Sequence, residues 1–388
     1  MRTAAPGALL VLIMAQPNMA TGMMPYYRHA WGLAPLLITV IFATYLFALT
    51  PTLTFIGTPP SRNAWWWRIG VGSGCGIGAD IAMSLADSAG PACAARVLAG
   101  LSVGLVTGSL AGLILERKGE RGRTAMATAT VLGSALGTIA AAWVAQYLPA
   151  PGVTVYLCHA VLLGGVALIV VTNRSPGHRV TASRAVAAQS TEPPMAGYLN
   201  GIAAWVSAGL VVALLPSYGA ELLGTTNLPL LALPVGLYLV SAWVVQRAAP
   251  PATLRGEPIL AQLIIIAGVA VAAAVAIAPS LPLLLAGAVL AGCGQGIAYR
   301  TGLRIVSAAT APDQHARIAS RYAAVAYLCA AVATIGFGVV ATVATMQDAV
   351  IAAAIALIAV ASATTIVRKR ARSHAPVAQP ETPTATTA

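Results

Sequence analysis

The stretch DSAGPACAARVLAGLSVGLVTGSLAGLILERKGERGR, residues 87–123, decides the fold expected for this chain. Between Arg96 and Glu116 it has no charged side chain, and it then ends in a cluster of charges. At about 1.5 Å per residue, a helix over such a run is long enough to cross a hydrocarbon layer of about 30 Å. The stretch therefore predicts a membrane-spanning helix that retains one cation, Arg96.

The whole chain has the same character. Of its 388 residues, 58% are hydrophobic and only 8% are charged, a balance that excludes a water-soluble domain of this length. The apolar runs are continuous and do not alternate, which favours helices over the strands of a membrane barrel. We predict an all-α polytopic membrane protein with twelve transmembrane helices, at residues 6–26, 31–56, 65–85, 91–115, 124–148, 153–172, 196–220, 228–246, 258–278, 281–299, 320–345 and 349–367.

The positive residues predict the orientation, because lysine and arginine are retained on the cytoplasmic side of a membrane. With the amino terminus inside, 20 of the 22 Lys and Arg residues fall in cytoplasmic segments, and only Arg28 and Arg96 do not. We therefore expect a multi-pass protein of the plasma membrane with both termini in the cytoplasm. The net charge of +12 reports this topology and requires no nucleic-acid partner.

A polar segment rich in Ser, Pro, Arg and Thr separates the sixth and seventh predicted helices. This composition is typical of a flexible linker. We predict an N-terminal six-helix bundle at 1–173, a cytoplasmic linker at 174–195, a C-terminal six-helix bundle at 196–367 and a disordered cytoplasmic tail at 368–388.

The two predicted bundles carry matching features at a nearly constant offset along the chain. Pro25 and Pro216 form one such pair, and Gly100 and Gly292 form another. An internal repeat is expected to show such an offset. Because each half holds an even number of helices, the repeat is predicted to be parallel, with an axis along the membrane normal.

With these features the chain resembles the major facilitator superfamily. The stretch RVLAGLSVG from Arg96 is similar to the family's helix 4 motif, with Gly100 and Gly104 at the small positions and Ala99 in place of glutamine. The region 290–328 is similar to helices 10 and 11 of bacterial efflux-type members. The resemblance implies two six-helix bundles that alternate access to a shared central cavity.

Other family motifs are degenerate in this chain. The loop between helices 2 and 3 keeps Gly57 and Arg62 of its motif but lacks the aspartate, where Ser61 stands. Helix 5 carries Gly133 and Gly137 of the glycine motif of drug antiporters, although small residues at this spacing also serve ordinary helix packing.

The resemblance implies that helices 1, 4, 7 and 10 line the cavity, so their polar residues are the substrate-binding candidates. For Gln16 and Asn18 the alternative is an interhelical hydrogen bond, and for Arg300 it is anchoring at the cytoplasmic surface. Arg96 alternatively lies near the outer boundary and extends its side chain to water. The substrate-binding candidates are Gln16, Asn18, Arg96, Tyr218, Gln295, Tyr299 and Arg300.

Few acids lie within the predicted helices, and they are the candidates for proton coupling together with Arg96. Asp80 is the most deeply placed, and a structural pair with Arg96 across the turn between helices 3 and 4 is its alternative. Glu221 alternatively marks a solvated helix end. His159 has no acid partner that the sequence makes evident, and the dispersed cysteines and histidines predict no metal site or cofactor.

These observations predict a secondary active transporter that exports a small apolar or amphipathic compound, with proton antiport as the coupling to be tested. An uptake permease or facilitator is the first alternative. A non-transporting membrane protein or an intramembrane enzyme is the second, although no catalytic cluster is visible in the sequence. We expect the partners to be a small-molecule substrate, protons and the lipid bilayer, and the protein to be a monomer without enzymatic activity.

Overall fold

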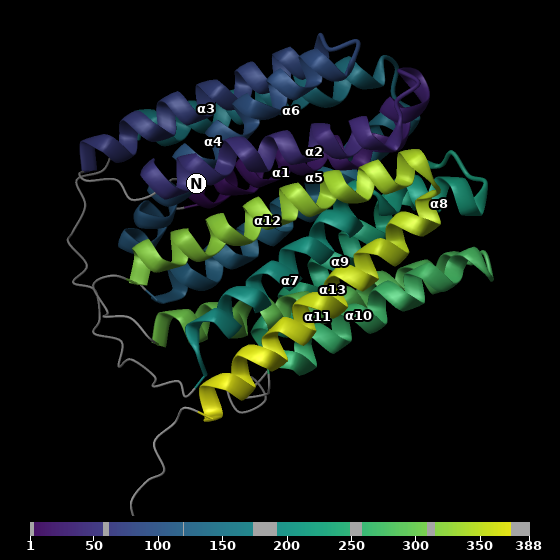
Figure 1. Ribbon diagram of the computed structural model, residues 1–388. Coiled ribbons are helices and arrows are strands. Elements are labelled where there is room, and N and C mark those ends of the chain that lie inside the picture. Colours follow the sequence, from purple (N-terminus) through teal and green to yellow (C-terminus); the bar gives the residue numbers. More distant parts are fainter. Residues whose placement is uncertain are drawn as a thin grey trace, which may run out of the picture.

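The computed structural model describes residues 4–56, 62–118, 120–173, 192–248, 258–308 and 315–373. All regular structure in these ranges is helical. Figure 1 shows the long helices lying side by side along one common direction. The elements are α1 (Ala5–Ala30), α2 (Pro35–Pro51), η1 (Thr52–Ile56), α3 (Arg62–Ser84), α4 (Ala89–Lys118), α5 (Glu120–Tyr147), α6 (Pro151–Thr172), α7 (Pro194–Ala213), α8 (Leu215–Leu223), α9 (Leu228–Ala248), α10 (Pro258–Ala273), η3 (Ala274–Ala276), α11 (Leu281–Ala308), α12 (His315–Val343) and α13 (Met346–Ser373).

The bundle has two ends, which we name by the parts of the chain found there. The terminal face is the end at which α1 begins at Ala5 and α13 ends at Ser373. The far face is the opposite end, which carries α8 and the short turns 31–34 and 148–150 (Figure 1). An even number of crossings returns the chain to the face from which it started.

Twelve crossings make up the bundle, as the sequence predicts. Helices α2 and η1, α7 and α8, and α10 and η3 each form a single crossing. In the described part of the chain, eleven helices are long and apolar enough to span a membrane. The twelfth crossing, α3, is less apolar because its middle alternates glycine with other residues in GVGSGCGIG, residues 70–78, but it packs along α4 and α6.

Two helix boundaries near the far face differ from the predicted ones for backbone reasons. Helix α2 begins at Pro35, not at residue 31, because Gly32 adopts a left-handed φ of 62° that ends the preceding helix. The seventh crossing is interrupted at Leu214, just before Pro216. Proline lacks the N–H needed for a helical hydrogen bond and its ring crowds the preceding turn.

At the terminal face two helices continue beyond their predicted ends. Helix α11 extends to Ala308 and α13 extends to Ser373, so the first residues of the predicted tail, 368–373, are helical. The linker residues 174–191 and the tail residues 374–388 lie outside the described residues. The boundaries of the linker and of the disordered tail therefore remain predictions.

The packing of the helices repeats between the two halves. Helix α1 packs against α4, α5 and α6, and α3 packs against α4 and α6. After a shift of six crossings, α7 packs against α11, α12 and α13, and α10 packs against α11 and α13. Gly32 and Gly224, which have the same separation as Gly100 and Gly292, are the two glycines of the described chain with a positive φ, 62° and 60°. The predicted pseudo-symmetric pair of six-helix bundles is confirmed.

The halves meet through two helix pairs that the repeat makes equivalent, α2 with α12 and α5 with α9. Each pair is joined at the far face by a hydrogen bond of 2.9 Å. The backbone N–H of Leu36 donates to Thr342 Oγ1, and that of Leu228 donates to Gln146 Oε1. Leu36 and Leu228 are again separated by the offset of the repeat, so the two bonds occupy equivalent places.

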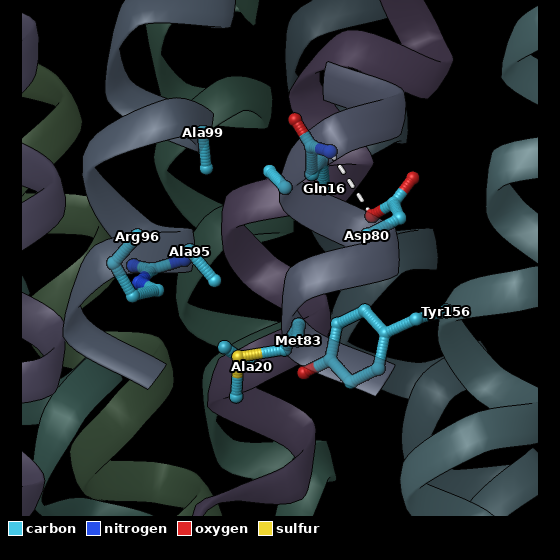
Figure 2. Close-up of a pocket in the computed structure, with 9 residues that line it drawn as sticks. Gln16, Ala20, Asp80, Met83, Ala95, Arg96, Ala99 and Tyr156 are labelled. Carbon is cyan, nitrogen blue, oxygen red and sulfur yellow. Dashed lines mark hydrogen bonds between the residues drawn. The ribbon is translucent and has the colours of Figure 1, made fainter. Parts of the chain in front are cut away.

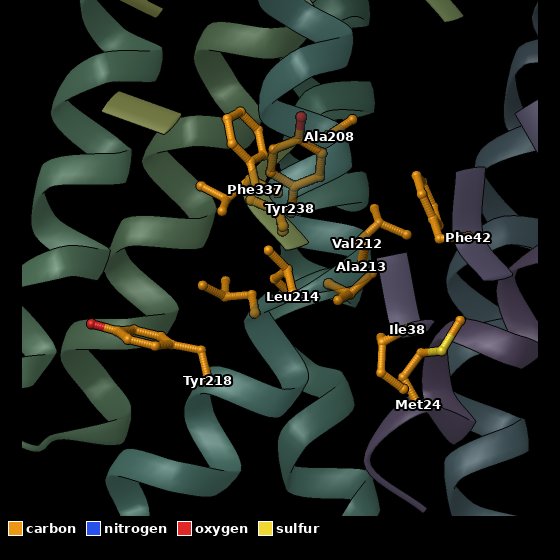
Figure 3. Close-up of a cluster of buried hydrophobic side chains, with 14 of the residues drawn as sticks. Met24, Ile38, Phe42, Ala208, Val212, Ala213, Leu214, Tyr218, Tyr238 and Phe337 are labelled. Atoms are coloured by element: carbon orange, nitrogen blue, oxygen red, sulfur yellow. The ribbon is translucent and has the colours of Figure 1, made fainter. Parts of the chain in front are cut away.

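An apolar cluster fills the space between the halves on the side of the far face. Figure 3 shows Met24 of α1 and Ile38 and Phe42 of α2 close to Val212 and Ala213 of α7. Together with side chains of α8, α9 and α12 they form one buried cluster. We call the part of this cluster that these residues form the far-face plug, because their apolar side chains are buried between the halves.

Candidate functional site

A cavity of about 360 Å³ lies between the halves, on the terminal-face side of the plug. The N-terminal half lines it with residues of α1, α2, η1, α4 and α5, and the C-terminal half with residues of α7, α9, α11 and α12. The cavity extends from Asn18 and Arg96, deep in the bundle, to Leu53 and Gln246 close to the terminal face. The lining of the cavity thus runs from the middle of the bundle towards the terminal face.

Aromatic side chains form much of the cavity wall. The Trp205 ring makes an edge-to-face contact with Tyr327 at 4.2 Å between ring centroids, and Tyr299 lies 6.3 Å from it. The indole N–H groups of Trp205 and Trp243 are buried and have no hydrogen-bond partner among the described residues. The aromatic lining residues are Phe42, Tyr45, Trp205, Tyr238, Trp243, Tyr299 and Tyr327.

Arg96 of α4 is the one charged residue among those that line the cavity. Its side chain is buried, with 3% of its surface exposed, which rules out the alternative of a guanidinium extended to water. Nη1 donates to the carbonyl oxygen of Pro17 at 2.8 Å, and Nε donates to that of Ile41 at 3.3 Å. The guanidinium also lies 4.8 Å from the ring centroid of Tyr45, a favourable cation–π distance. Three elements, α1, α2 and α4, thus hold the cation in place.

A second polar site lies within the N-terminal half, where α1, α3 and α6 meet. Asp80 of α3 is 1% exposed, and its Oδ2 lies 2.7 Å from His159 Nδ1 of α6. Gln16 of α1 donates from Nε2 to Asp80 Oδ1 at 3.0 Å, the contact drawn in Figure 2. The other ring nitrogen, His159 Nε2, lies 3.0 Å from the carbonyl oxygen of Leu12. We call Gln16, Asp80 and His159 the buried triad.

The geometry of the buried triad requires a proton between Asp80 and His159. A carbonyl oxygen can only accept a hydrogen bond, so the contact with Leu12 places a hydrogen on His159 Nε2. The Nδ1 to Oδ2 contact then needs a hydrogen of its own, carried either by a doubly protonated imidazole or by a neutral carboxylic acid. In both cases the pair holds one proton more than an ionised aspartate beside a neutral histidine.

Asp80 and Arg96 do not form the ion pair that the sequence allowed. They face the same small void of about 10 Å³, together with Gln16, Tyr156 and several small side chains. Figure 2 shows Arg96 on one side of this void and Asp80 on the other. Asp80 has His159 as its partner instead, a pairing that the sequence did not make evident. A space of this size is close to the minimum that one water molecule occupies.

The remaining substrate-binding candidates divide into two groups. Asn18, Gln295 and Tyr299 line the cavity together with Arg96, whereas Gln16 belongs to the buried triad. Arg300 donates from Nη1 to the carbonyl oxygen of Gln246 at the end of α9. A cation at that position stabilises the helix end, and Arg300 is not among the residues that line the cavity.

Tyr218 lies at the far face, outside the cavity. Its hydroxyl donates to Gln347 Oε1 of α13, a contact that ties α8 to the last crossing. The equivalent tie in the first half is the 2.7 Å hydrogen bond between the hydroxyls of Tyr27 and Tyr156. Tyr27 and Tyr218 have the same separation along the chain as Tyr156 and Gln347, so this pair of contacts follows the repeat.

Glu221 also lies at the far face, where it pairs with Arg28. Arg28 and Arg96 are the two cations that fall outside the predicted cytoplasmic segments. Arg28 Nη2 of α1 lies 3.2 Å from Glu221 Oε2 of α8, with side chains 31% and 47% exposed. The pair links the halves on the outer side of the plug. Glu221 thus lies at a solvated helix end, as the alternative expected, but its carboxylate also pairs with Arg28.

The motif glycines allow close helix contacts. A side chain at Gly100 would meet the backbone of α2 at Tyr45, and one at Gly104 would meet Thr52. Gly133 and Gly137 lie against the carbonyl groups of α1, so α5 and α1 pack backbone to backbone. Gly57 lies outside the described residues. Arg62 begins α3, but its side chain also lies outside what the structure describes.

The sequence analysis missed His159 and most of the aromatic wall. His159 and Asp80 are 79 residues apart, and no local pattern joins them. Trp205 and Tyr327 had a usable signal, because aromatic residues in the middle of a crossing depart from the usual belt at membrane surfaces. In the described part of the chain no cluster of His, Cys, Asp or Glu is arranged to hold a metal ion.

Two six-helix halves that repeat in parallel around a shared cavity define the fold of the major facilitator superfamily. The chain has this fold. No family model matches the sequence, and no curated protein sequence matches it. The likeness is to solved structures at low sequence identity, and at that identity it establishes the fold alone.

The nucleoside transporter NupG superposes with a TM-score of 0.75 at 12% identity, over 94% of this chain and 98% of NupG. A point mutant of NupG gives the same score and identity over 95% of this chain and 100% of its own. A bacterial homologue of the human lysosomal transporter Spinster, solved in an inward-facing and occupied conformation, superposes with a TM-score of 0.71 at 13% identity, over 95% and 96%.

Proposed function

We propose that the protein is a secondary active transporter that moves a small amphipathic compound by alternating access. The observation that carries this proposal is the cavity between two pseudo-symmetric halves, whose lining extends towards the terminal face while buried apolar side chains lie on its other side. A membrane-embedded enzyme would need a cluster of catalytic groups at such a cavity. The described lining residues offer a single ionisable cation and no acid or histidine.

We assign the terminal face to the cytoplasm of a plasma-membrane protein. The charge pattern supports this orientation, because 20 of the 22 Lys and Arg residues fall in segments that the sequence predicts to be cytoplasmic. Of these, Arg368, Lys369 and Arg370 lie at the end of α13, at the terminal face. The conformation described here is then inward-facing. The two off-pattern cations, Arg28 and Arg96, are both explained by contacts within the protein.

We propose export as the direction, because the walls are aromatic and aliphatic and carry few of the polar groups that a sugar would require. Uptake is the alternative. NupG, which has the same fold, is a nucleoside transporter, and a nucleoside is a compound that flat aromatic walls could also accept. Transport of a radiolabelled nucleoside is therefore a direct test of the uptake alternative.

We propose that the buried triad carries the coupling proton. Asp80 and His159 together require one proton in this conformation, and the void beside Asp80 separates them from Arg96 on the cavity wall. Loss of that proton would place an ionised carboxylate against the lone pair of Nδ1, or leave the remaining hydrogen on Nδ1, so that the lone pair of Nε2 faces the carbonyl oxygen of Leu12. Either change alters the packing of α1 on α6, which connects proton release to helix movement.

The experiment is a flux assay in inverted membrane vesicles with an imposed proton gradient. Compounds are first selected by the growth of a pump-depleted host that expresses the protein. Proton-driven accumulation of a selected compound, lost in Asp80→Asn, would support export by antiport. Accumulation that ignores the gradient would contradict proton coupling, and a protein that moves no compound in either direction would contradict transport.

A further inference from the structure

The cavity wall carries an unbalanced charge, which points to the charge of its ligand. Arg96 has five N–H donors, of which the described residues satisfy two through the carbonyl groups of Pro17 and Ile41. No carboxylate lines the cavity, and no described acid lies within ion-pair distance of Arg96. A buried charge without a counter-charge is costly, so a ligand that supplies an anionic group would gain the interaction that the protein leaves open.

The same arrangement excludes an organic cation. A positively charged ligand would lose its hydration in a cavity without a carboxylate and would lie beside another cation. The nearest acid, Asp80, is on the other side of the small void and is already bonded to His159 and Gln16. The charge of the wall therefore selects against cations and in favour of one negative charge.

The shape and the remaining polar groups of the wall describe the rest of the ligand. Rings of Trp205, Tyr299 and Tyr327 from three helices of the C-terminal half meet the cavity, and aromatic pairs favour stacked or edge-to-face contact with another ring. The acceptor and donor groups of Asn18 and Gln295 also line the cavity, so polar atoms of a ligand can be bonded there. A volume of about 360 Å³ lies in the ordinary range for small-molecule sites.

We propose that the cavity binds flat aromatic compounds with a single negative charge, with the anionic group against Arg96 and the ring against the aromatic wall of the C-terminal half. This inference rests on the proposed function, because it names the substrate class of the same cavity.

The test uses three probes with one ring system, 2-naphthoate, 2-naphthamide and 2-naphthylmethylammonium, and the purified full-length protein at neutral pH. Their binding is measured by isothermal titration calorimetry. We expect the carboxylate to bind at least about tenfold more tightly than the amide, in line with one charge-assisted contact, and the ammonium to bind most weakly. Equal or tighter binding of the ammonium would overturn the proposal, as would failure of all three probes to bind.

Variants separate the charge from the ring. Arg96→Gln is expected to remove the preference for naphthoate over naphthamide while the affinity for naphthamide changes little, and Arg96→Lys is expected to keep the preference. Trp205→Leu should weaken the carboxylate and the amide alike, whereas the matched change Trp67→Leu, at a residue 62% exposed and outside the cavity lining, should weaken neither. An undiminished preference in a folded Arg96→Gln protein would overturn the proposal even if Arg96→Lys failed to fold.

The binding test and the transport proposal fail in different ways. If naphthoate binds as expected but the halves never exchange access between the two faces, the substrate site stands and the transporter proposal is wrong. If access alternates but the carboxylate has no advantage, the transporter proposal stands and the substrate class is wrong.

Discussion

The two halves of the bundle share their helix packing and differ in the chemistry of their interiors. The first half places Gln16, Asp80 and His159 where its first, third and sixth crossings meet. The second half has a polar cluster on the corresponding helices α7, α10 and α13, in which Gln262 Nε2 donates to Asn200 Oδ1 at 3.1 Å and to Thr364 Oγ1 at 3.0 Å. Each cluster joins the first, third and sixth crossings of its own half. Only the cluster of the first half contains groups that can gain or lose a proton.

The cavity wall is divided in the same way. The second half contributes Trp205, Tyr238, Trp243, Tyr299 and Tyr327, and the first half contributes the cation Arg96 with two aromatic residues. Around the cavity, a repeated framework has therefore diverged into a half that supplies the one charged side chain and a half that supplies most of the aromatic rings. The two halves can therefore share their helix packing without sharing the side-chain chemistry of their interiors.

The largest effect is expected at Asp80. Asp80→Asn keeps the size of the side chain and removes its ability to carry a proton, so proton-driven flux should fall by about a hundredfold, the lower end of what a proton-transfer group contributes. Flux in vesicles with and without a proton gradient measures this. The matched change in the second half, Gln262→Met, removes polar contacts without removing a titratable group and should leave the proton dependence intact. An equal loss of coupling in both variants would contradict the assignment of the proton to the first half.

Much of this architecture could be predicted from the sequence, because lipid restricts the chain to long apolar helices. All twelve crossings follow from hydropathy and charge, and the offset between the predicted repeats recurs in Gly32 and Gly224 and in the bonds of Leu36 and Leu228. Helix ends were less predictable, since a left-handed glycine or a proline decides them locally. For Arg300 the sequence left two alternatives open, because charge alone does not say whether a cation faces the cavity or the end of a neighbouring helix.

The buried triad was beyond reach of the sequence for a different reason. Its members come from three helices and are joined only by tertiary packing, with 64 residues between Gln16 and Asp80 and 79 between Asp80 and His159. A pairing of Asp80 with Arg96 was reasonable from their positions around one turn. In the structure a small void, whose lining residues are drawn in Figure 2, separates the two side chains. Asp80 instead bonds to nearer partners on α1 and α6.

The next largest effect is expected at the equivalent glycines Gly100 and Gly292. A Cβ atom at Gly100 would lie 2.6 Å from the carbonyl oxygen of Tyr45, and one at Gly292 would overlap Tyr238 and Ser241. Alanine at either position should lower the free energy of unfolding by about 1–3 kcal/mol through overpacking. Gly74→Ala, where no atom lies within 4 Å, should not destabilise the protein. The stability of the three variants is measured by thermal unfolding in detergent. Unequal losses of stability at Gly100 and Gly292 would contradict the equivalence of these two positions.

A smaller effect is expected from the tie between Tyr27 and Tyr156. Tyr156→Phe leaves the buried hydroxyl of Tyr27 without its partner and should lower the free energy of unfolding by about 1–3 kcal/mol. The double change to phenylalanine removes both hydroxyls and should cost less than the single change. Thermal unfolding of the single and double variants tests this, and strictly additive losses would argue that the hydroxyls do not depend on each other.

The smallest effect is expected from the pair of Arg28 and Glu221. Both side chains are well exposed, so the double-mutant coupling between Arg28→Gln and Glu221→Gln should not exceed about 1 kcal/mol and should shrink as salt is added. The measurement is thermal unfolding of both variants and their combination at low and high ionic strength. A large coupling that salt does not reduce would mean that this pair, and not the apolar plug, holds the far face closed.

The most direct test of the account is the distance between the halves at each face. In a variant whose five native cysteines are replaced by serine, spin labels are placed at the far face on Leu148→Cys and Val343→Cys, and in a second protein at the terminal face on Phe55→Cys and Ala248→Cys. All four positions are exposed and each pair joins the two halves. Double electron–electron resonance is then recorded over a range of pH. Alternating access coupled to the buried triad predicts two populations whose ratio changes with pH, the far-face distance lengthening as the terminal-face distance shortens. A single distance at each face that does not respond to pH would contradict it.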